Sequence, residues 1–299
     1  MKFGLSLVGL RPRWYAAVAR QAEDNGFESV WLAEHLVLPA VMPATYLYSA
    51  NGQPPITPET PIYDPWVMLA GVAAVTTRIR LGTNVYVLPL RHPLVTARAV
   101  VSLDRLSGGR VTLGAGVGWL ATEYAAAGID FATRGRRMDE IIPLLRRLWS
   151  STGPVAHQGR YFAFEPVRFA PRALQKPGIP IELGGTSGPA LRRAGRLGDG
   201  WIELGSATLS ELAARIDEVR AARAAAGLAA APFEISSGFG ADLESVRETA
   251  AVGVTRTITA VPPAVAAGDL DDVLDWVGHY GATVVTPLAG ADGVASWRT

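Results

Sequence analysis

The chain has 299 residues, 49% of them hydrophobic and 18% charged, which is enough apolar material for a large packed core. A formal net charge of +1 lacks the basic excess of proteins that bind nucleic acid or anionic membranes, and we expect neither partner. The absence of cysteine excludes disulfides, thiolate nucleophiles and cysteine-based metal sites, and it fits a cytoplasmic protein.

The first residues, Met1–Val8, are typical of a β-strand and lack the charged and apolar regions of a signal peptide. No apolar stretch reaches the ~18 residues that a membrane span needs. We also expect no metal site, because the histidines are dispersed along the chain at His35, His92, His157 and His279.

Short β-rich runs alternate with longer helical patterns along the whole chain. Strands are predicted at Phe3–Val8, Ser29–Ala33, Ile79–Val87, Val111–Gly116, Ile181–Leu183, Trp201–Leu204, Phe233–Ser237 and Thr255–Thr259. Helices are predicted after them at Trp14–Asn25, Asp64–Val75, Pro93–Leu106, Arg136–Trp149, Pro189–Arg196, Ser210–Ala226, Leu243–Ala251 and Leu270–His279. These eight units predict an α/β fold, a single (β/α)8 TIM-barrel domain over residues 1–299. An open doubly wound sheet is the alternative, but its Gly-x-Gly-x-x-Gly fingerprint after the first strand is absent.

Two insertions interrupt the predicted barrel, one after strand two and one before strand five. The first, Pro39–Tyr63, is long enough to be either a lid over the catalytic face or a flexible insertion. The second, Gly153–Lys176, contains two short runs, Val155–Gln158 and Tyr161–Phe164, that predict a β-hairpin outside the barrel.

TIM barrels place their active sites at the carboxyl ends of the strands, so the residues that follow each strand are the candidates. Strand two is followed by Glu34 and His35. Neutral imidazole can donate to a cofactor carbonyl or exchange protons near neutral pH, which favours a catalytic or cofactor-binding role for His35. Glu34 either orients this imidazole or points into the barrel wall.

Glycines mark the ends of three further strands. Gly82, in strand three, suggests a bulge or the close approach of a planar group, with an ordinary barrel strand as the alternative. The alternating glycines of Gly114–Gly118 would let a ring or a phosphate lie on bare backbone. Gly184–Gly188 opens a helix whose free amides favour an anion, and Arg192 and Arg193 could add positive charge one turn later. The alternative is an ordinary tight βα loop, which has the same glycine pattern.

No Ser-His-Asp order or Gly-x-Ser-x-Gly elbow is present, and Glu34 alone stands as a carboxylate at a convincing strand end. A cofactor is therefore expected to supply the chemistry.

Five segments together resemble a known family. They are residues 24–35 (DNGFESVWLAEH), 81–85 (LGTNV), 91–93 (RHP), 103–123 (from LDRLSGGR through GVGW to Glu123) and 180–201 (PIELGG and AGRLGDGW). The chain resembles the luciferase-like monooxygenase superfamily over almost its whole length, and most of all its coenzyme F420-dependent oxidoreductase branch.

The resemblance implies a role for each candidate. His35 would lie beside the pyrimidine-like ring of the cofactor, and Asn84-Val85 would form a non-prolyl cis-peptide bulge behind its central ring. The ribityl chain would lie near Gly116, Val117 and Gly118. The phosphate would be held by Gly184, Gly185, Thr186 and Ser187. Arg11 and Arg13, after strand one, would either meet the acidic tail of F420 or simply be solvated.

The chain departs from the sugar-phosphate dehydrogenases of this branch, in which a glutamate follows the Gly-x-Gly. Trp119 stands there instead, and the only lysines are Lys2 and Lys176, so the lysines that bind the sugar phosphate have no counterpart. We therefore expect an apolar or aromatic substrate, against a wall made by Trp119 and aromatic residues of the 39–63 loop.

These features predict an F420-dependent oxidoreductase that transfers a hydride between deazaflavin and a small organic substrate. An FMN-dependent two-component monooxygenase is the first alternative, and a cofactor-binding barrel without activity is the second. By analogy with the family we expect a homodimer formed through barrel-side helices, where Leu69, Val72 and Val75 provide apolar surface.

Overall fold

The strands form a closed parallel barrel in the computed structural model, which describes residues 1–49, 51–205 and 208–289. Its strands are β1 (Lys2–Ser6), β2 (Ser29–Leu32), β3 (Arg80–Thr83), β4 (Tyr86–Val87), β5 (Val111–Gly116), β8 (Ile181–Gly184), β9 (Gly200–Ile202), β10 (Glu234–Ser237) and β11 (Arg256–Ala260). They neighbour one another in the order β3-β2-β1-β11-β10-β9-β8-β5, and pairing of β3 with β5 closes the ring. β3 and β4 are two pieces of one strand position of the barrel, or stave, because both pair with β5. The barrel therefore has the eight staves predicted from the sequence.

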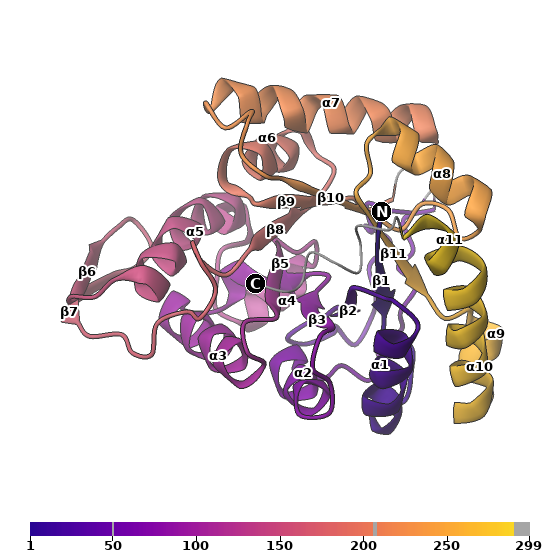
Figure 1. The fold of residues 1–299 in the computed structure, drawn as a ribbon. Coiled ribbons are helices and arrows are strands. Elements are labelled where there is room, and N and C mark those ends of the chain that lie inside the picture. Colours follow the sequence, from indigo (N-terminus) through magenta and orange to yellow (C-terminus); the bar gives the residue numbers. More distant parts are fainter. Residues whose placement is uncertain (50, 206–207, 290–299) are drawn as a thin grey trace.

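Helices surround the barrel (Figure 1). The eight that follow the staves are α1 (Tyr15–Asp24), α2 (Pro65–Ala73), α3 (Pro93–Leu106), α5 (Arg134–Ser150), α6 (Gly188–Leu197), α7 (Leu209–Ala225), α8 (Leu243–Val252) and α10 (Leu270–Tyr280). Each lies within a few residues of its predicted range. The sequence did not predict the short helices α4 (Ala121–Ala126), α9 (Pro263–Ala266) and α11 (Thr286–Leu288). Among the described residues, none of the helices is both long and apolar enough to cross a membrane.

Trp31 of β2 packs inside the barrel with Ile202 and Ile258, which come from β9 and β11. A Cβ on Gly82 would lie 2.3 Å from the indole, and one on Gly4 would lie 2.5 Å from Nε1. The planar group predicted to approach Gly82 is therefore this indole. Trp31 satisfies its own N–H by donating to Ser29 Oγ at 2.8 Å.

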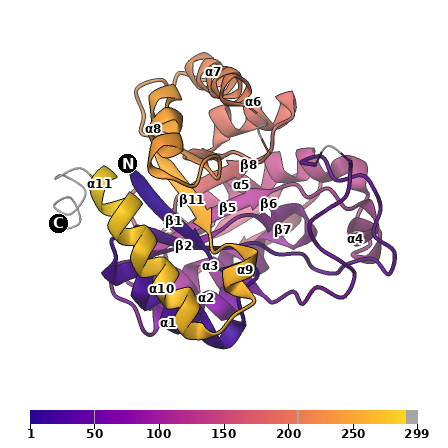
Figure 2. The ribbon, with the colours of Figure 1, turned by 90° about the vertical axis from the view of Figure 1, so that its right-hand side faces the viewer.

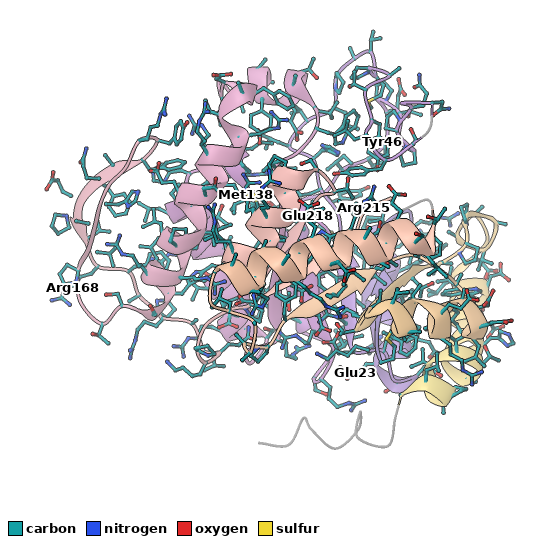
Figure 3. The ribbon with its side chains drawn as sticks, turned by 90° about the horizontal axis from the view of Figure 1, so that it is seen from above. Glu23, Tyr46, Met138, Arg168, Arg215 and Glu218 are labelled. Carbon is teal, nitrogen blue, oxygen red and sulfur yellow. The ribbon has the colours of Figure 1, made fainter. Side chains whose placement is uncertain are left out.

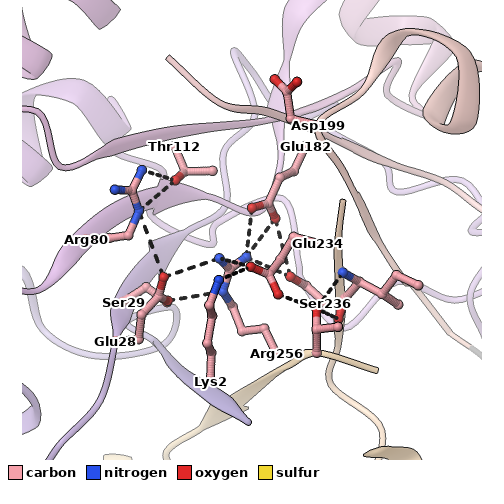
Figure 4. Close-up of polar contacts among 12 residues, drawn as sticks. Lys2, Glu28, Ser29, Arg80, Thr112, Glu182, Asp199, Glu234, Ser236 and Arg256 are labelled. Atoms are coloured by element: carbon pink, nitrogen blue, oxygen red, sulfur yellow. Dashed lines mark hydrogen bonds and ion pairs between the residues drawn. The ribbon is translucent and has the colours of Figure 1, made fainter. Parts of the chain in front are cut away.

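A buried ion network fills the amino-terminal end of the barrel (Figure 4). Arg256, the first residue of β11, contacts Glu182 at 2.8 Å, Glu28 at 3.1 Å and Glu234 at 3.3 Å. Burial raises the pKa of Glu182, and Arg256 opposes that shift by holding the carboxylate in its charged form. The network joins β8, β10 and β11 with Glu28, which precedes β2. These ion pairs lie at the end of the barrel opposite the carboxyl ends of the strands, where the active site is expected.

Both insertions lie outside the barrel. The second contains an antiparallel hairpin of β6 (Val155–Gln158) and β7 (Ala163–Val167), the latter beginning two residues later than predicted. The first forms a long loop between β2 and α2 that passes near α4 (Figure 2).

The apolar residues expected to form a dimer surface are mostly core residues. Leu69 and Val72 are 0% and 1% exposed, because they face the barrel from α2. Only Val75, at 37% exposed, remains at the surface, so the surface predicted from these residues is wrong. Residues 290–299 of the predicted 1–299 domain lie outside the described residues.

Candidate active site

A cavity of about 1160 Å³ opens at the carboxyl ends of the strands. All of the predicted site residues line it: Glu34, His35, Asn84, Val85, Gly116, Val117, Gly118, Trp119, Gly184, Gly185, Thr186 and Ser187. These residues come from the ends of four staves that lie far apart in the sequence, and barrel closure brings them to one place. A cavity of this size exceeds the usual range for a single small ligand, which leaves room for a cofactor and a substrate together.

The imidazole of His35 is held by Glu123. Nδ1 lies 3.1 Å from Glu123 Oε2, and the Leu36 amide donates to the other carboxylate oxygen. The Glu123 side chain is fully buried, while 15% of the His35 side chain remains exposed. With Nδ1 occupied, Nε2 is the ring nitrogen available to a ligand. Glu123 lies in one of the segments that carry the family resemblance. Its helix, α4, was not predicted, so nothing in the sequence pointed to a role for this residue.

Glu34 does not orient His35. Its carboxylate instead accepts a hydrogen bond from the Val87 amide at 2.6 Å and binds the Arg91 guanidinium through both oxygens. Burial raises the pKa of Glu34, and the bonds from Arg91 and Val87 counteract that shift. A buried carboxylate requires such a partner, and Arg91 supplies one that the sequence did not identify. Glu34 therefore fixes the wall of the cavity next to His35.

The peptide between Asn84 and Val85 is cis, as the resemblance implied. It interrupts the third stave between β3 and β4, which the sequence predicted as one continuous strand. The amide oxygen Oδ1 of Asn84 is buried without a hydrogen-bond partner, and Asn84 borders both the large cavity and a second one of about 300 Å³. An unpartnered acceptor at the cavity wall fits a ligand that brings its own N–H or O–H donor.

The glycines that end β5 make room for side chains and backbone of the neighbouring strand. A Cβ on Gly114 would lie 1.7 Å from the Thr83 carbonyl oxygen, and one on Gly116 would lie 2.6 Å from Val85. One on Gly118 would lie 2.7 Å from Val87. The space of the missing side chains is therefore filled by the neighbouring strand. Gly116 and Gly118 also line the cavity, and the packing of a ring or phosphate on their backbone stays a prediction.

The predicted anion loop lies where α6 begins. Ser187 is the N-cap residue, and its side chain makes no capping hydrogen bond. The arginines expected to add positive charge are engaged elsewhere: Arg192 contacts Glu218 at 3.3 Å, and Arg193 contacts Asp139 at 2.7 Å. Both arginines therefore have carboxylate partners within the protein, and neither lines the cavity.

Aromatic side chains form one wall. The Trp119 ring lies edge-on to His35 with centroids 6.1 Å apart, and edge-on to Tyr46 at 5.0 Å. Tyr46 comes from the long loop, which Figure 3 shows at the edge of the molecule opposite Glu23. Tyr48 follows it and packs against Gly205, after β9. Since β2 and β9 face each other across the barrel, the loop spans the mouth of the cavity.

Comparison with solved structures shows the same fold. An F420-dependent secondary alcohol dehydrogenase, in complex with an F420–acetone adduct, superposes with a TM-score of 0.76 at 17% identity, covering 95% of this chain and 98% of that one. The monooxygenase RslO1 from Streptomyces bottropensis gives a TM-score of 0.72 at 22% identity, covering 96% and 99%.

Sequence comparison finds closer relatives. The uncharacterized protein Rv0940c of Mycobacterium tuberculosis is 34% identical over 247 residues, covering 82% of this chain and 84% of that protein. An F420-dependent glucose-6-phosphate dehydrogenase of Kineococcus radiotolerans is 34% identical over 195 residues, covering 64% of this chain and 52% of that enzyme. A family model described as luciferase-like monooxygenase matches residues 6–280. The chain therefore belongs to the luciferase-like monooxygenase family.

Proposed function

We propose that the chain is an F420-dependent oxidoreductase that transfers a hydride between deazaflavin and a small apolar or aromatic substrate. The observation that carries the proposal is His35, whose Nδ1 is fixed by a buried carboxylate while its ring borders the large cavity. Similarity to an F420-dependent dehydrogenase of Kineococcus supports the choice of cofactor.

Glu123 determines what His35 can do. When Nδ1–H donates to the carboxylate, Nε2 of the neutral ring is an acceptor that can take a proton, and Nε2–H of the imidazolium can return one. His35 is thus suited to donate to a cofactor carbonyl or to exchange a proton with substrate. The bound deazaflavin would be the partner that donates or accepts the hydride.

The remaining cavity residues fit such a cofactor. The Asn84 Oδ1 acceptor lacks a partner, and Val85, Gly116, Val117 and Gly118 provide a surface with few polar side chains on which a ring and its chain would pack. Gly184, Gly185, Thr186 and Ser187 would hold the phosphate with amides and hydroxyls at the start of α6.

The proposed substrate class follows from the aromatic wall. Trp119 and Tyr46 face the space next to His35, and no lysine lines the cavity among the residues that the structure describes. Lys2 is bound to Glu234 at the other end of the barrel. These contacts favour a substrate recognised by apolar packing over a sugar phosphate.

An FMN-dependent monooxygenase with a separate reductase is the second candidate, since the family description itself names monooxygenases. Parallel fluorescence titrations with F420 and FMN, followed by anaerobic single-turnover reactions, distinguish the two. Tight F420 binding with oxygen-independent hydride transfer supports the proposal. FMN preference with oxygen-dependent product formation would support the monooxygenase. Cofactor binding without any turnover would favour a cofactor-binding barrel without activity, and binding of neither cofactor would contradict the cofactor assignment itself.

The proposal includes assembly as a cytoplasmic homodimer, by analogy with the family. Light scattering on the purified protein tests the assembly, and a monomer at all concentrations would contradict it.

A further inference from the structure

A second cavity, of about 300 Å³, lies beside the large one at the carboxyl ends of β9 and β10. Asn84 and Leu204 line both cavities, so a molecule in the large cavity can extend a group past these side chains into the second. The volume is at the lower end of the range for small-ligand sites. The second cavity therefore suits one end of a ligand better than a whole ligand.

The walls of the second cavity are mostly apolar. Ile202 and Ile258 line it, and both pack against Trp31 in the barrel interior, which fixes their positions. Phe239 lines it from the segment that follows β10. Apolar surroundings have a low local dielectric, so a polar contact made within them is stronger than the same contact in water.

Glu203 places a buried carboxylate in these surroundings. It is 5% exposed and lines the second cavity. Its Oε2 accepts a hydrogen bond from the Ser237 hydroxyl at 3.0 Å, and that hydroxyl accepts one from the Phe239 amide at 3.0 Å. These bonds attach the carboxylate to the end of β10. A carboxylate accepts hydrogen bonds at about four positions, so it can keep these partners and still bind a donor of a ligand.

The charges around Glu203 favour a donor over an anion. Arg215 of α7 approaches Glu203 Oε1 to 3.7 Å, and its other terminal nitrogen pairs with Glu211. One guanidinium thus lies between two carboxylates, and this cluster of three residues has one negative charge in excess. A cation or a neutral O–H or N–H group in the second cavity would be attracted to Glu203, and an anion would be repelled.

A row of aromatic rings connects His35 with the second cavity. The centroid of the Trp119 ring lies 6.1 Å from that of His35 and 5.0 Å from that of Tyr46. The Tyr46 and Tyr48 centroids are 5.2 Å apart. Tyr48 packs on Gly205, where an added Cβ would lie 2.9 Å from the tyrosine Cβ, and Gly205 lines the second cavity. A substrate that packs along this row and reacts at its histidine end has its other end at the buried carboxylate.

We propose that Glu203 binds a hydrogen-bond donor of the substrate in the second cavity, either a hydroxyl or a protonated amine, while the apolar part of the same molecule packs along the aromatic row. The proposal rests on the proposed function in one respect, because it takes the reaction to occur next to His35. It narrows the substrate class to apolar or aromatic molecules that carry such a donor at the end remote from the reacting group.

The test uses four aromatic ketones that differ in a single substituent: acetophenones with an aminomethyl, hydroxymethyl, ethyl or carboxylate group in the para position. Isothermal titration calorimetry at neutral pH, without cofactor, measures the dissociation constant of each for the wild type, E203Q and E211Q. Glu211 supplies the matched control, because it pairs with the same Arg215 but its side chain is 41% exposed and lines neither cavity. Melting temperatures establish that each variant is folded.

We expect the wild type to bind the aminomethyl and hydroxymethyl compounds about 10- to 100-fold more tightly than the ethyl compound, and the carboxylate compound most weakly. E203Q should lose most of this preference while its affinity for the ethyl compound stays unchanged, and E211Q should keep the preference. A preference confined to the aminomethyl compound identifies the donor as an ammonium group, and one confined to the hydroxymethyl compound identifies it as a hydroxyl. If E203Q does not fold, E203D withdraws the carboxylate from the cavity by one methylene and should reduce the preference.

Equal affinities of the wild type for the ethyl compound and both donor compounds overturn the role of Glu203, and so does an equal loss in E203Q and E211Q. A wild type that binds F420 but none of the four ketones overturns it as well and leaves the proposed function in place. The proposed function itself fails through a separate result, the absence of F420 binding or of hydride transfer, because the ketone titrations need no cofactor.

Discussion

Nδ1 of His35 lies 3.1 Å from a carboxylate oxygen of Glu123, and the Leu36 amide donates to the second oxygen of the same group. One buried side chain on α4 therefore holds both the ring of His35 and the backbone that follows it. The histidine cannot turn without breaking a contact to this carboxylate, so its exposed ring nitrogen keeps a fixed direction.

Replacing Glu123 with Gln should slow hydride transfer more than it weakens cofactor binding. The amide keeps the size of the side chain but removes the charge that stabilises a protonated ring, and we expect a rate loss of about 100-fold. Single-turnover rates and cofactor titrations measure the two effects separately. Equal rates in E123Q and the wild type would contradict the role of this pair.

Replacing Trp119 with Ala should raise KM for the substrate about 10-fold and leave the affinity for cofactor nearly unchanged. The indole packs on Tyr46 and His35 at the wall assigned to the substrate. Steady-state kinetics with reduced cofactor at saturation measure the change. Y46F, which keeps the ring, serves as the control, and a W119A variant with unchanged KM would place the substrate elsewhere.

Alanine at Gly82 should destabilise the barrel by about 3 kcal/mol, since its methyl group would overlap the Trp31 indole. The matched variant is G71A on the exposed face of α2, where a Cβ meets nothing within 4 Å. That change should stabilise the chain by about 0.5–1 kcal/mol through helix propensity. Urea unfolding measures both, and the same sign for the two variants would contradict the packing described.

Replacing Arg256 with Met should lower the free energy of unfolding by about 3–5 kcal/mol, because three carboxylates would lose their shared buried partner. R192Q removes an exposed ion pair and should cost less than about 1 kcal/mol. Chemical denaturation compares them. A small effect in R256M would mean that water reaches the network.

The hairpin should loosen in acid. Burial raises the pKa of Glu140, but hydrogen bonds from His157 and from the Tyr161 and Phe162 amides outweigh it and hold the pKa below the ordinary value for glutamate. A depressed folded-state pKa stabilises the fold above the unfolded value, and that contribution is lost as pH falls through the folded one. Amide exchange of residues 160–162, corrected for the intrinsic rate, should therefore rise as pH drops below the ordinary pKa of glutamate. E140Q should show faster exchange already at neutral pH and a weaker dependence.

The alternation of strands and helices was sufficient to predict the barrel. His35, Trp119 and Ser187 each follow a strand, and this position was sufficient to predict that they would line one cavity. Both follow from local periodicity and a general property of the fold. The partners of these residues were not predictable in the same way. Glu123 and Arg91 act through contacts that span 88 and 57 residues of sequence, and nothing in the sequence marks which charge meets which.

The glycines of β5 illustrate a second limit. A run of alternating glycines indicates that something approaches the backbone closely, but it does not say what. In this barrel the neighbour is the adjacent stave, with Thr83, Val85 and Val87 against Gly114, Gly116 and Gly118. The identity of the approaching group depends on strand order, which is a tertiary property.

This interlocking row lies on two neighbouring strand positions of the barrel, one formed by β3 and β4 and the other by β5. If one stave slid by a single residue, Val85 would face Ala115 or Val117, where side chains already occupy the space. The row therefore disfavours a slip by one residue, and positions 83–87 and 114–118 should change in concert among homologues. The size of the side chain at one position limits the size of the residue opposite it. Side-chain size therefore selects the register in which these two strands pair.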